Sequence, residues 1–341
     1  MPFRVLLLVM GLCVWPHVAV TDRLERAYWQ CQEGMEDTSE PEKTIEACSH
    51  LLDSGSLPSV DLKFAYGSRG AAYLVTENYE AAIADFTELI RRSPVKAEAF
   101  KFRGDAYYGA GIYDRAIADY SHVIEYGHLR TEGFVRRCQA HFANGQVEHA
   151  LADCGIATRR YPKTVTAFLV RGGIFMSTGA YEEALMDFDE ASRLEPDSWL
   201  AWLRRGDANY EMGQYERAIS DYQRAVHLNP NARNLNAWAW SLYLASQYGR
   251  ALVEIERSLA LEPDNPAAID TRAHVLAALG RTDEALTNFR RALEIADPES
   301  IAFYQEALVG HGYTVKVDGV YGPEMRQALK ACIESGCRLL K

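Results

Sequence analysis

The chain has 341 residues, of which 48% are hydrophobic and 24% charged, with 24 glycines and 12 prolines. This usage is typical of folded globular chains and excludes a disordered, collagen-like or multi-span membrane protein. The net charge of −11 disfavours nucleic acid as a partner, because phosphate binding needs a basic surface.

Residues 1–20 have the pattern of a secretory signal peptide. Arg4 precedes an apolar run from Val5 to Trp15, and no acidic residue occurs before Asp22. The run is too short to span a bilayer. We therefore predict a periplasmic or otherwise extracytoplasmic protein with no membrane contact beyond this segment. An uncleaved anchor is the alternative, because His17 stands where a cleavage site prefers a small residue.

Residues 21–62 predict a degenerate pair of helices, over 23–32 and 41–53. Each helix carries one cysteine, Cys31 and Cys48. Six cysteines remain if the signal is removed, an even number that suits an oxidising compartment. A disulfide between Cys31 and Cys48 would pin an end of the chain that no neighbouring unit covers. Buried free thiols are the alternative.

Residues 63–298 repeat with a period of 34. An Arg-Gly dipeptide, an aromatic residue, a small alanine and a closing proline recur at this interval. The seven units start at Lys63, Ala97, Thr131, Val165, Trp199, Ala232 and Pro266. The pattern resembles the tetratricopeptide repeat (TPR), whose unit is two antiparallel helices. The resemblance implies an all-α fold, a right-handed solenoid of helix pairs.

The small and large residues of the repeat have a packing role. Gly206 lies on one face of a first helix, and Tyr222 lies on one face of the second helix of the same unit. Glycine lets the two backbones approach while the aromatic ring fills the gap. In the third unit Cys138 takes the glycine position and Cys154 the aromatic position, so we predict a disulfide between them.

Side chains at fixed offsets on the first helices are expected to line the inner face of the solenoid. They are mainly aromatic with a few cations: Lys101, Tyr108, Arg136, Phe142, Arg204, Tyr210, Asn236, Trp240 and Tyr243, with Asp105 and Asp207 among them. Resemblance to TPR arrays implies a groove for a protein or peptide partner, in which the cations attract carboxylates. Packing between units is the alternative role of the aromatic residues.

A second series pairs an arginine of each first helix with an aspartate sixteen residues later. The arginines are Arg69, Arg103, Arg137, Arg171 and Arg205, and the aspartates are Asp85, Asp119, Asp153, Asp187 and Asp221. A ligand site is usually local, whereas this pairing occurs in every one of these units. We therefore predict a structural role, within or between units.

Residues 299–341 leave the period. Two helical segments flank GYTVKVDGVYGP, residues 312–323, and this arrangement resembles the peptidoglycan-binding domain. The resemblance implies murein contact through Tyr313, Asp318, Gly319, Tyr321, Gly322 and Arg326. The predicted small core comprises Leu308, Tyr313, Val317, Ala328 and Leu329. A helix stop at Gly336 predicts a local disulfide between Cys332 and Cys337. A simple cap on the solenoid is the alternative.

No catalytic signature is present. The sequence lacks HExxH, CxxC, a phosphate loop and GxSxG, and its nine histidines are scattered. We predict no catalytic residue, metal or cofactor. The sequence thus predicts a non-catalytic adaptor that binds a protein or peptide and contacts peptidoglycan, with a protein-only scaffold or assembly factor as the alternative.

Overall fold

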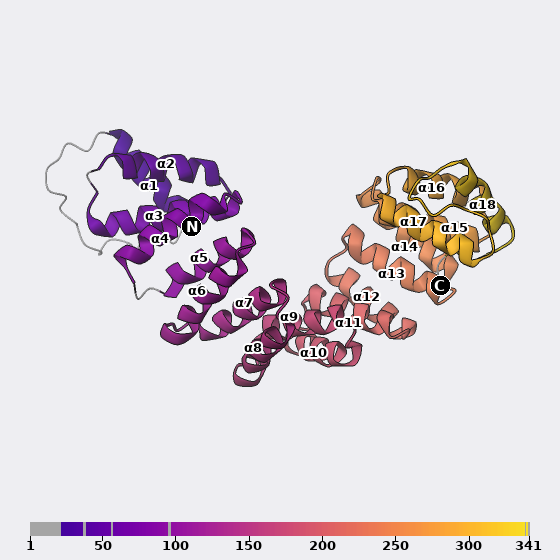
Figure 1. Cartoon of the computed structure of the whole chain (residues 1–341), viewed down its shortest axis with the longest axis horizontal. Coiled ribbons are helices and arrows are strands. Elements are labelled where there is room, and N and C mark those ends of the chain that lie inside the picture. Colours follow the sequence, from indigo (N-terminus) through magenta and orange to yellow (C-terminus); the bar gives the residue numbers. More distant parts are fainter. Residues whose placement is uncertain (1–21, 37–38, 56, 95–96, 338, 340–341) are drawn as a thin grey trace, which may run out of the picture. The chain divides into compact units, whose positions relative to one another are not determined.

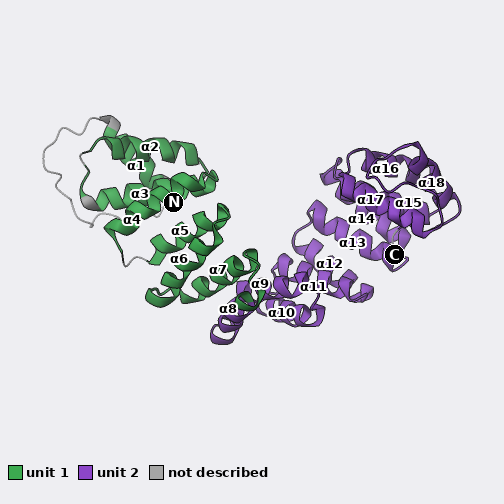
Figure 2. Ribbon diagram, viewed as in Figure 1, with its two compact units in different colours: residues 1–150 green, residues 151–341 purple. Residues whose placement is uncertain are grey.

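The computed structural model describes residues 22–36, 39–55, 57–94, 97–337 and 339. These residues form eighteen α-helices and no strand (Figure 1), so the all-α prediction is confirmed. The chain divides into two compact units, residues 1–150 and 151–341 (Figure 2). None of the described helices is long and apolar enough to cross a membrane. The predicted signal segment, 1–20, lies outside the described residues.

The first unit consists of helix pairs in chain order. They are α1 (Asp22–Glu36) and α2 (Pro41–Asp53), α3 (Ser59–Val75) and α4 (Tyr79–Arg92), α5 (Ala97–Gly109) and α6 (Tyr113–Tyr126), followed by α7 (Arg130–Ala143). Helix α8 (Val147–Arg160) begins in this unit and ends in the second.

The second unit continues the pairs and adds the C-terminal segment. It contains α9 (Val165–Ser177) and α10 (Tyr181–Leu194), α11 (Trp199–Glu211) and α12 (Tyr215–Leu228), α13 (Ala232–Leu244) and α14 (Tyr248–Leu261), α15 (Pro266–Ala278) and α16 (Thr282–Glu294), then α17 (Pro298–Gly310) and α18 (Pro323–Glu334).

The predicted unit starts agree closely with the helix starts. Helices α5, α9, α11, α13 and α15 begin at the predicted residues, and α7 begins one residue early, at Arg130. Helix α3 begins at Ser59 rather than Lys63, directly after Pro58, which precedes the helix in an extended conformation. A proline pre-sets the backbone for a helix start, which explains the earlier boundary.

The glycine positions of the repeat lie against aromatic rings. A Cβ atom built on Gly206 would stand 2.7 Å from Cε1 of Tyr222, and one built on Gly172 would stand 2.6 Å from Cε1 of Phe188. Both rings are buried. The helices of a pair can therefore approach this closely only where the first helix has no side chain.

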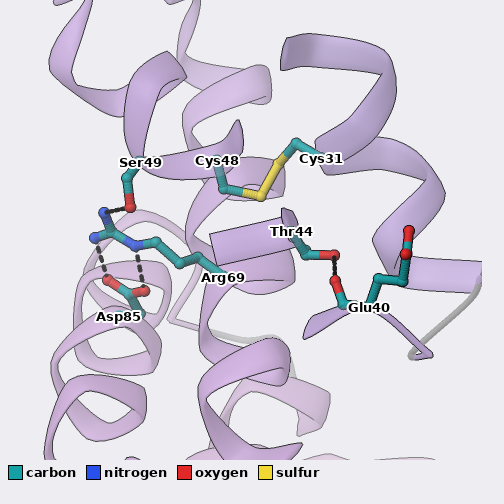
Figure 3. The surroundings of a disulfide bond; sticks show 7 residues. All are labelled: Cys31, Glu40, Thr44, Cys48, Ser49, Arg69 and Asp85. Carbon is teal, nitrogen blue, oxygen red and sulfur yellow. Dashed lines mark hydrogen bonds and ion pairs between the residues drawn. A yellow bond between two sulfur atoms is a disulfide. The ribbon is translucent and has the colours of Figure 1, made fainter. Parts of the chain in front are cut away.

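The repeated arginines bind within and between units. Arg171 donates Nε to Oδ2 of Asp187 at 2.8 Å and Nη2 to Oδ1 at 2.6 Å, and its Nη1 donates to Oγ1 of Thr158, on the preceding helix pair, at 2.7 Å. Arg69 does the same with Asp85 and Ser49 (Figure 3). Because the guanidinium groups of Arg69 and Arg171 each join their own pair of helices to the pair before it, these arginines have the structural role predicted for the series.

The leading pair of helices carries the first two cysteines. Cys31 of α1 and Cys48 of α2 are fully buried, and their Cα atoms lie 5.0 Å apart across a disulfide bond (Figure 3). Helix α2 begins at Pro41, as expected, whereas α1 extends beyond residue 32 to Glu36. Cys138 and Cys154, on α7 and α8, are also fully buried, and their pairing stays a prediction.

The C-terminal segment shares its core with the last helix pair. Leu276 of α15 and Phe289 of α16 belong to the same buried cluster as Leu308 of α17 and Leu329 of α18. Val317 was predicted in this core and is 46% exposed, so that prediction is wrong. Here Val315 packs against the cluster instead. Residues 313–317 form no regular strand, so two valines that stand two positions apart do not share one face as they would in a strand. The segment covers the end of the repeat array.

Helix α18 ends as expected before the last cysteine. Gly336 has φ +75°, and the backbone N–H of Cys337 donates to the carbonyl oxygen of Cys332 at 3.0 Å. The Cα atoms of the two cysteines are 5.1 Å apart, a separation that a disulfide bond can span, and their pairing stays a prediction.

Candidate functional site

The first helix of each pair lies on the inside of the stack. Successive first helices contact one another within each unit: α3 with α5, α9 with α11, and α13 with α15. Helices approach most closely on the concave side of a curved array. The predicted groove residues lie on first helices, α5 and α7 in the first compact unit and α11 and α13 in the second. Side chains of successive first helices meet there, Lys101 with Glu132 and Trp240 with Tyr210.

In the first compact unit, residues 1–150, the predicted cations are already ion-paired. Nζ of Lys101 lies 3.2 Å from Oε1 of Glu132 and 3.9 Å from Oδ2 of Asp105. Nε of Arg136 lies 3.7 Å from the other oxygen of Asp105, to which the hydroxyl of Tyr120 also donates at 2.8 Å. Burial raises the pKa of Asp105, and the charge of Arg136 opposes that shift. These cations hold a network together, so an incoming carboxylate would have to compete with Asp105 and Glu132.

The aromatic residues of this unit remain partly open. Tyr108 is exposed and meets Tyr113 edge-on, with ring centroids 5.6 Å apart. Phe142 is half-buried. Both side chains can contact a partner without a rearrangement of the core.

In the second compact unit, residues 151–341, the predicted aromatic groove residues form a connected row. Nε1 of Trp240 donates to the hydroxyl of Tyr210 at 2.9 Å, and the ring of Trp240 stacks on Tyr243 with centroids 5.0 Å apart. Tyr210 and Trp240 are half-buried. Tyr243 is only 4% exposed, so its prediction as a groove residue is wrong. Its ring belongs to the core and packs beneath Trp240.

Polar groups flank this row. Nη1 of Arg204 lies 3.5 Å from Oδ2 of Asp207, whose other oxygen accepts the hydroxyl of Tyr222 at 2.9 Å. Burial raises the pKa of Asp207. Asn236 is half-buried, and within the described structure its buried Oδ1 atom accepts no hydrogen bond. Because this oxygen is buried, a partner's N–H group cannot reach it without a movement of the surrounding side chains.

A buried polar chain that the sequence analysis missed continues the row. Nε2 of His274 lies 2.8 Å from the hydroxyl of Tyr304, which donates to Oδ1 of Asp270. Because the single hydroxyl proton goes to Asp270, Nε2 of His274 acts as the donor. Burial lowers the pKa of His274 to about 3 and raises that of Asp270 to about 6. Asp270 and His274 lie 34 residues after Asn236 and Trp240, at the same positions of the next repeat. The repeat period could therefore have identified both residues from the sequence.

In the C-terminal loop, the candidate murein contacts are tied to the module itself. Oε1 of Gln305 accepts the backbone N–H groups of Asp318 and Gly319, both at 2.9 Å, and its Nε2 donates to Oδ1 of Asp318 at 3.0 Å. Gly319 has φ +70°, and a Cβ atom there would stand 2.7 Å from the carbonyl oxygen of Pro298. Asp318 and Gly319 therefore shape the loop.

The other motif residues lie around α18. The hydroxyl of Tyr313 lies 3.1 Å from Oγ of Ser335, and the guanidinium of Arg326 lies 5.6 Å from the ring centroid of Tyr321. Gly322 caps α18, which begins at Pro323 as expected. Arg326 is exposed and Tyr321 is half-buried, which leaves these two side chains open to a ligand.

The described residues contain no group of three or more side chains suited to hold a metal ion. The arrangement contains partly exposed aromatic and polar side chains on several of the first helices. Such a surface can bind an extended chain or a helix by contact and hydrogen bonding.

Comparisons with known proteins identify the repeat. Family models described as tetratricopeptide repeat match residues 68–125 and 136–191, 199–232, and 268–298, which together are just over half of the chain. A comparison with curated proteins found no match.

Solved structures share the fold. A tetratricopeptide repeat protein from Parabacteroides merdae ATCC 43184 is 16% identical, with 69% of this chain and 93% of that chain covered and a TM-score of 0.52. The C-terminal part of a TPR repeat-containing protein from Cytophaga hutchinsonii is 17% identical, with 73% and 98% covered and a TM-score of 0.53. A chain of the APC/C hetero-tetramer Cut9–Hcn1 is 15% identical, with 79% and 52% covered and a TM-score of 0.53.

Proposed function

Because the chain belongs to the tetratricopeptide-repeat family, we propose that it is a non-catalytic scaffold that binds a protein or peptide along the inner face of its first helices. The observation that carries the proposal is a set of partly exposed aromatic side chains on four of the first helices. Tyr108, Phe142 and Tyr210 occupy the same position of their repeats, and Trp240 stands three residues before the buried Tyr243, which holds that position in its own repeat. Aromatic side chains supply large contact areas at low entropic cost, and they are enriched where partners bind.

Site-specific photo-crosslinking tests this function. A photoreactive phenylalanine analogue replaces Tyr108, Phe142 or Tyr210 in the full chain, in the cells that make it. Matched controls place the same analogue at Tyr126 on α6 and Met186 on α10, which are exposed hydrophobic positions on second helices. The proposal expects a discrete adduct at the inner positions and none at the controls. Equal crosslinking at both sets of positions would contradict it.

We also propose that the chain works outside the cytoplasm and that its C-terminal module contacts peptidoglycan. The sequence motif and the signal-like start support this, together with a pocket of about 410 Å³ beside the loop. Its lining includes Lys316, Asp318 and Glu324, and such polar groups suit a glycan or a peptide stem. The alternative is that the module only caps the solenoid, and its shared core with α15 and α16 supports that role.

Cosedimentation with insoluble peptidoglycan separates these alternatives. The intact chain is compared with an Arg326→Ala variant, and a Lys330→Ala variant serves as the control because Lys330 is an exposed cation on the same helix. Sedimentation that is lost only in Arg326→Ala supports murein binding. An intact chain that stays in the supernatant leaves the module as a cap.

A further inference from the structure

An open pocket lies where the repeat array meets the C-terminal segment. It has a volume of about 650 Å³ and is formed by the start of α15, the end of α16 and the first half of α17. Ile295 and Phe303 form part of its wall and are 53% and 57% exposed. Two large apolar side chains beside one pocket supply contact area for an apolar stem.

The pocket is acidic. Asp270, Asp297 and Glu299 line it, and within the described chain no lysine or arginine forms an ion pair with any of the three. Ser300 donates its backbone N–H and its hydroxyl to Asp297, both at 2.8 Å, as a helix cap. Asp270 accepts the hydroxyl of Tyr304, and the nearest imidazole, His274, is buried and neutral. The negative charge of the pocket is therefore not neutralised by a cation of the chain itself.

The pocket continues the inner face described above. Asp270 occupies on α15 the position that Asn236 occupies on α13, and Tyr304 of α17 donates its hydroxyl to Asp270. A partner that follows the aromatic row from Tyr210 to Trp240 would reach this pocket next. The non-repeat helix α17 supplies Phe303 and Glu299, so this part of the surface has no counterpart between the regular units.

We propose that the pocket receives a lysine or arginine side chain of the bound partner. The aliphatic stem of that side chain packs on Ile295 and Phe303, and its charged head lies beside Asp270. Lysine and arginine are the residues that combine a long apolar stem with a cationic head. The assignment rests on the proposed function, because it specifies which residue of a bound peptide the array prefers at one position.

Retention of defined peptide pools by the immobilised full chain tests the assignment. Each pool is a hexapeptide mixture with one fixed central residue, which is lysine, norleucine or glutamate. Norleucine keeps the stem of lysine without its charge. We expect the lysine pool to be retained about tenfold better than the other two, as for one charge-assisted contact in a partly buried site.

Two variants that each remove one negative charge show whether the preference for lysine depends on Asp270. Asp270→Asn keeps an oxygen acceptor for Tyr304 and is expected to reduce lysine retention to the norleucine level. Asp283→Asn removes a charge from an exposed position on α16 outside the pocket, and it should preserve the preference. Phe303→Ser changes an exposed side chain and should weaken retention of both the lysine and the norleucine pools, which keeps the test valid if Asp270→Asn folds poorly.

The outcomes separate the two proposals. Retention of all pools without a preference for lysine overturns the pocket assignment and leaves peptide binding intact. A preference that survives in Asp270→Asn, or that is lost equally in Asp283→Asn, also overturns the assignment. Failure to retain any pool refutes both the assignment and the proposed peptide groove.

Discussion

Two adjacent glycines of α9 allow a sharp test of how the helix pairs are packed. Gly172 occupies the glycine position of the repeat, and a Cβ atom there would stand 2.6 Å from Cε1 and 2.9 Å from Cζ of Phe188. At Gly173 a Cβ atom would have no neighbour within 4 Å. The substitutions Gly172→Ala and Gly173→Ala are therefore chemically identical and differ only in what the new methyl group meets.

The expected magnitudes follow from two opposing effects. Alanine in place of glycine inside a helix stabilises it by about 0.5–1 kcal/mol, so Gly173→Ala should stabilise the protein by that amount. At Gly172 the same gain is offset by overpacking, which costs about 1–3 kcal/mol when the surroundings cannot yield. Phe188 is fully buried, so its ring has little room to move. The two variants should differ by about 1–3 kcal/mol, with Gly172→Ala the less stable.

Urea unfolding followed by far-ultraviolet circular dichroism measures the difference. Repeat arrays need not unfold in one step, so the midpoints of the two variants are compared under identical conditions. Replacing Phe188 with leucine in the same background should largely abolish the cost of Gly172→Ala, because the two sites are coupled by direct contact. Equal shifts for the two alanine variants would refute the packing argument.

Three further predictions concern charge and the disulfide. Asp187→Ala leaves Arg171 without its buried partner, and the unfolding free energy should fall by about 3–5 kcal/mol; a fall below about 1 kcal/mol in urea titrations would contradict a structural role. Replacing Cys31 and Cys48 together with serine should cost about 3 kcal/mol, the chain-entropy value for a separation of 17 residues, and the loss should appear as faster amide exchange in α1 and α2. The raised pKa of Asp270, about 6, means that the folded state binds its proton more tightly than the unfolded state does. Stability relative to Asp270→Asn should therefore decline as the pH rises from about 4 to about 6, and a difference that is independent of pH would contradict the assigned pKa.

The sequence by itself determined the repeat and most helix boundaries. A helix pair is a local structure in which contacting residues are about sixteen positions apart, as for Gly206 and Tyr222 or Arg171 and Asp187. The 34-residue period then applies the same contacts to every unit. For this reason spacing alone predicted the close approach of the helices, the structural arginines and the face on which the groove residues lie.

Only the tertiary structure decided which of those groove residues are open and which are already engaged. Lys101 pairs with Glu132, 31 residues later in the next 34-residue repeat. Tyr243 is buried beneath Trp240 although both lie on the same face of one helix. The burial of the C-terminal segment against α15 and α16, with Val317 turned outwards, likewise depends on contacts between elements. An offset in a repeat assigns a side chain to a face, whereas its exposure and its partners depend on which neighbours come within a few ångströms once the elements are packed.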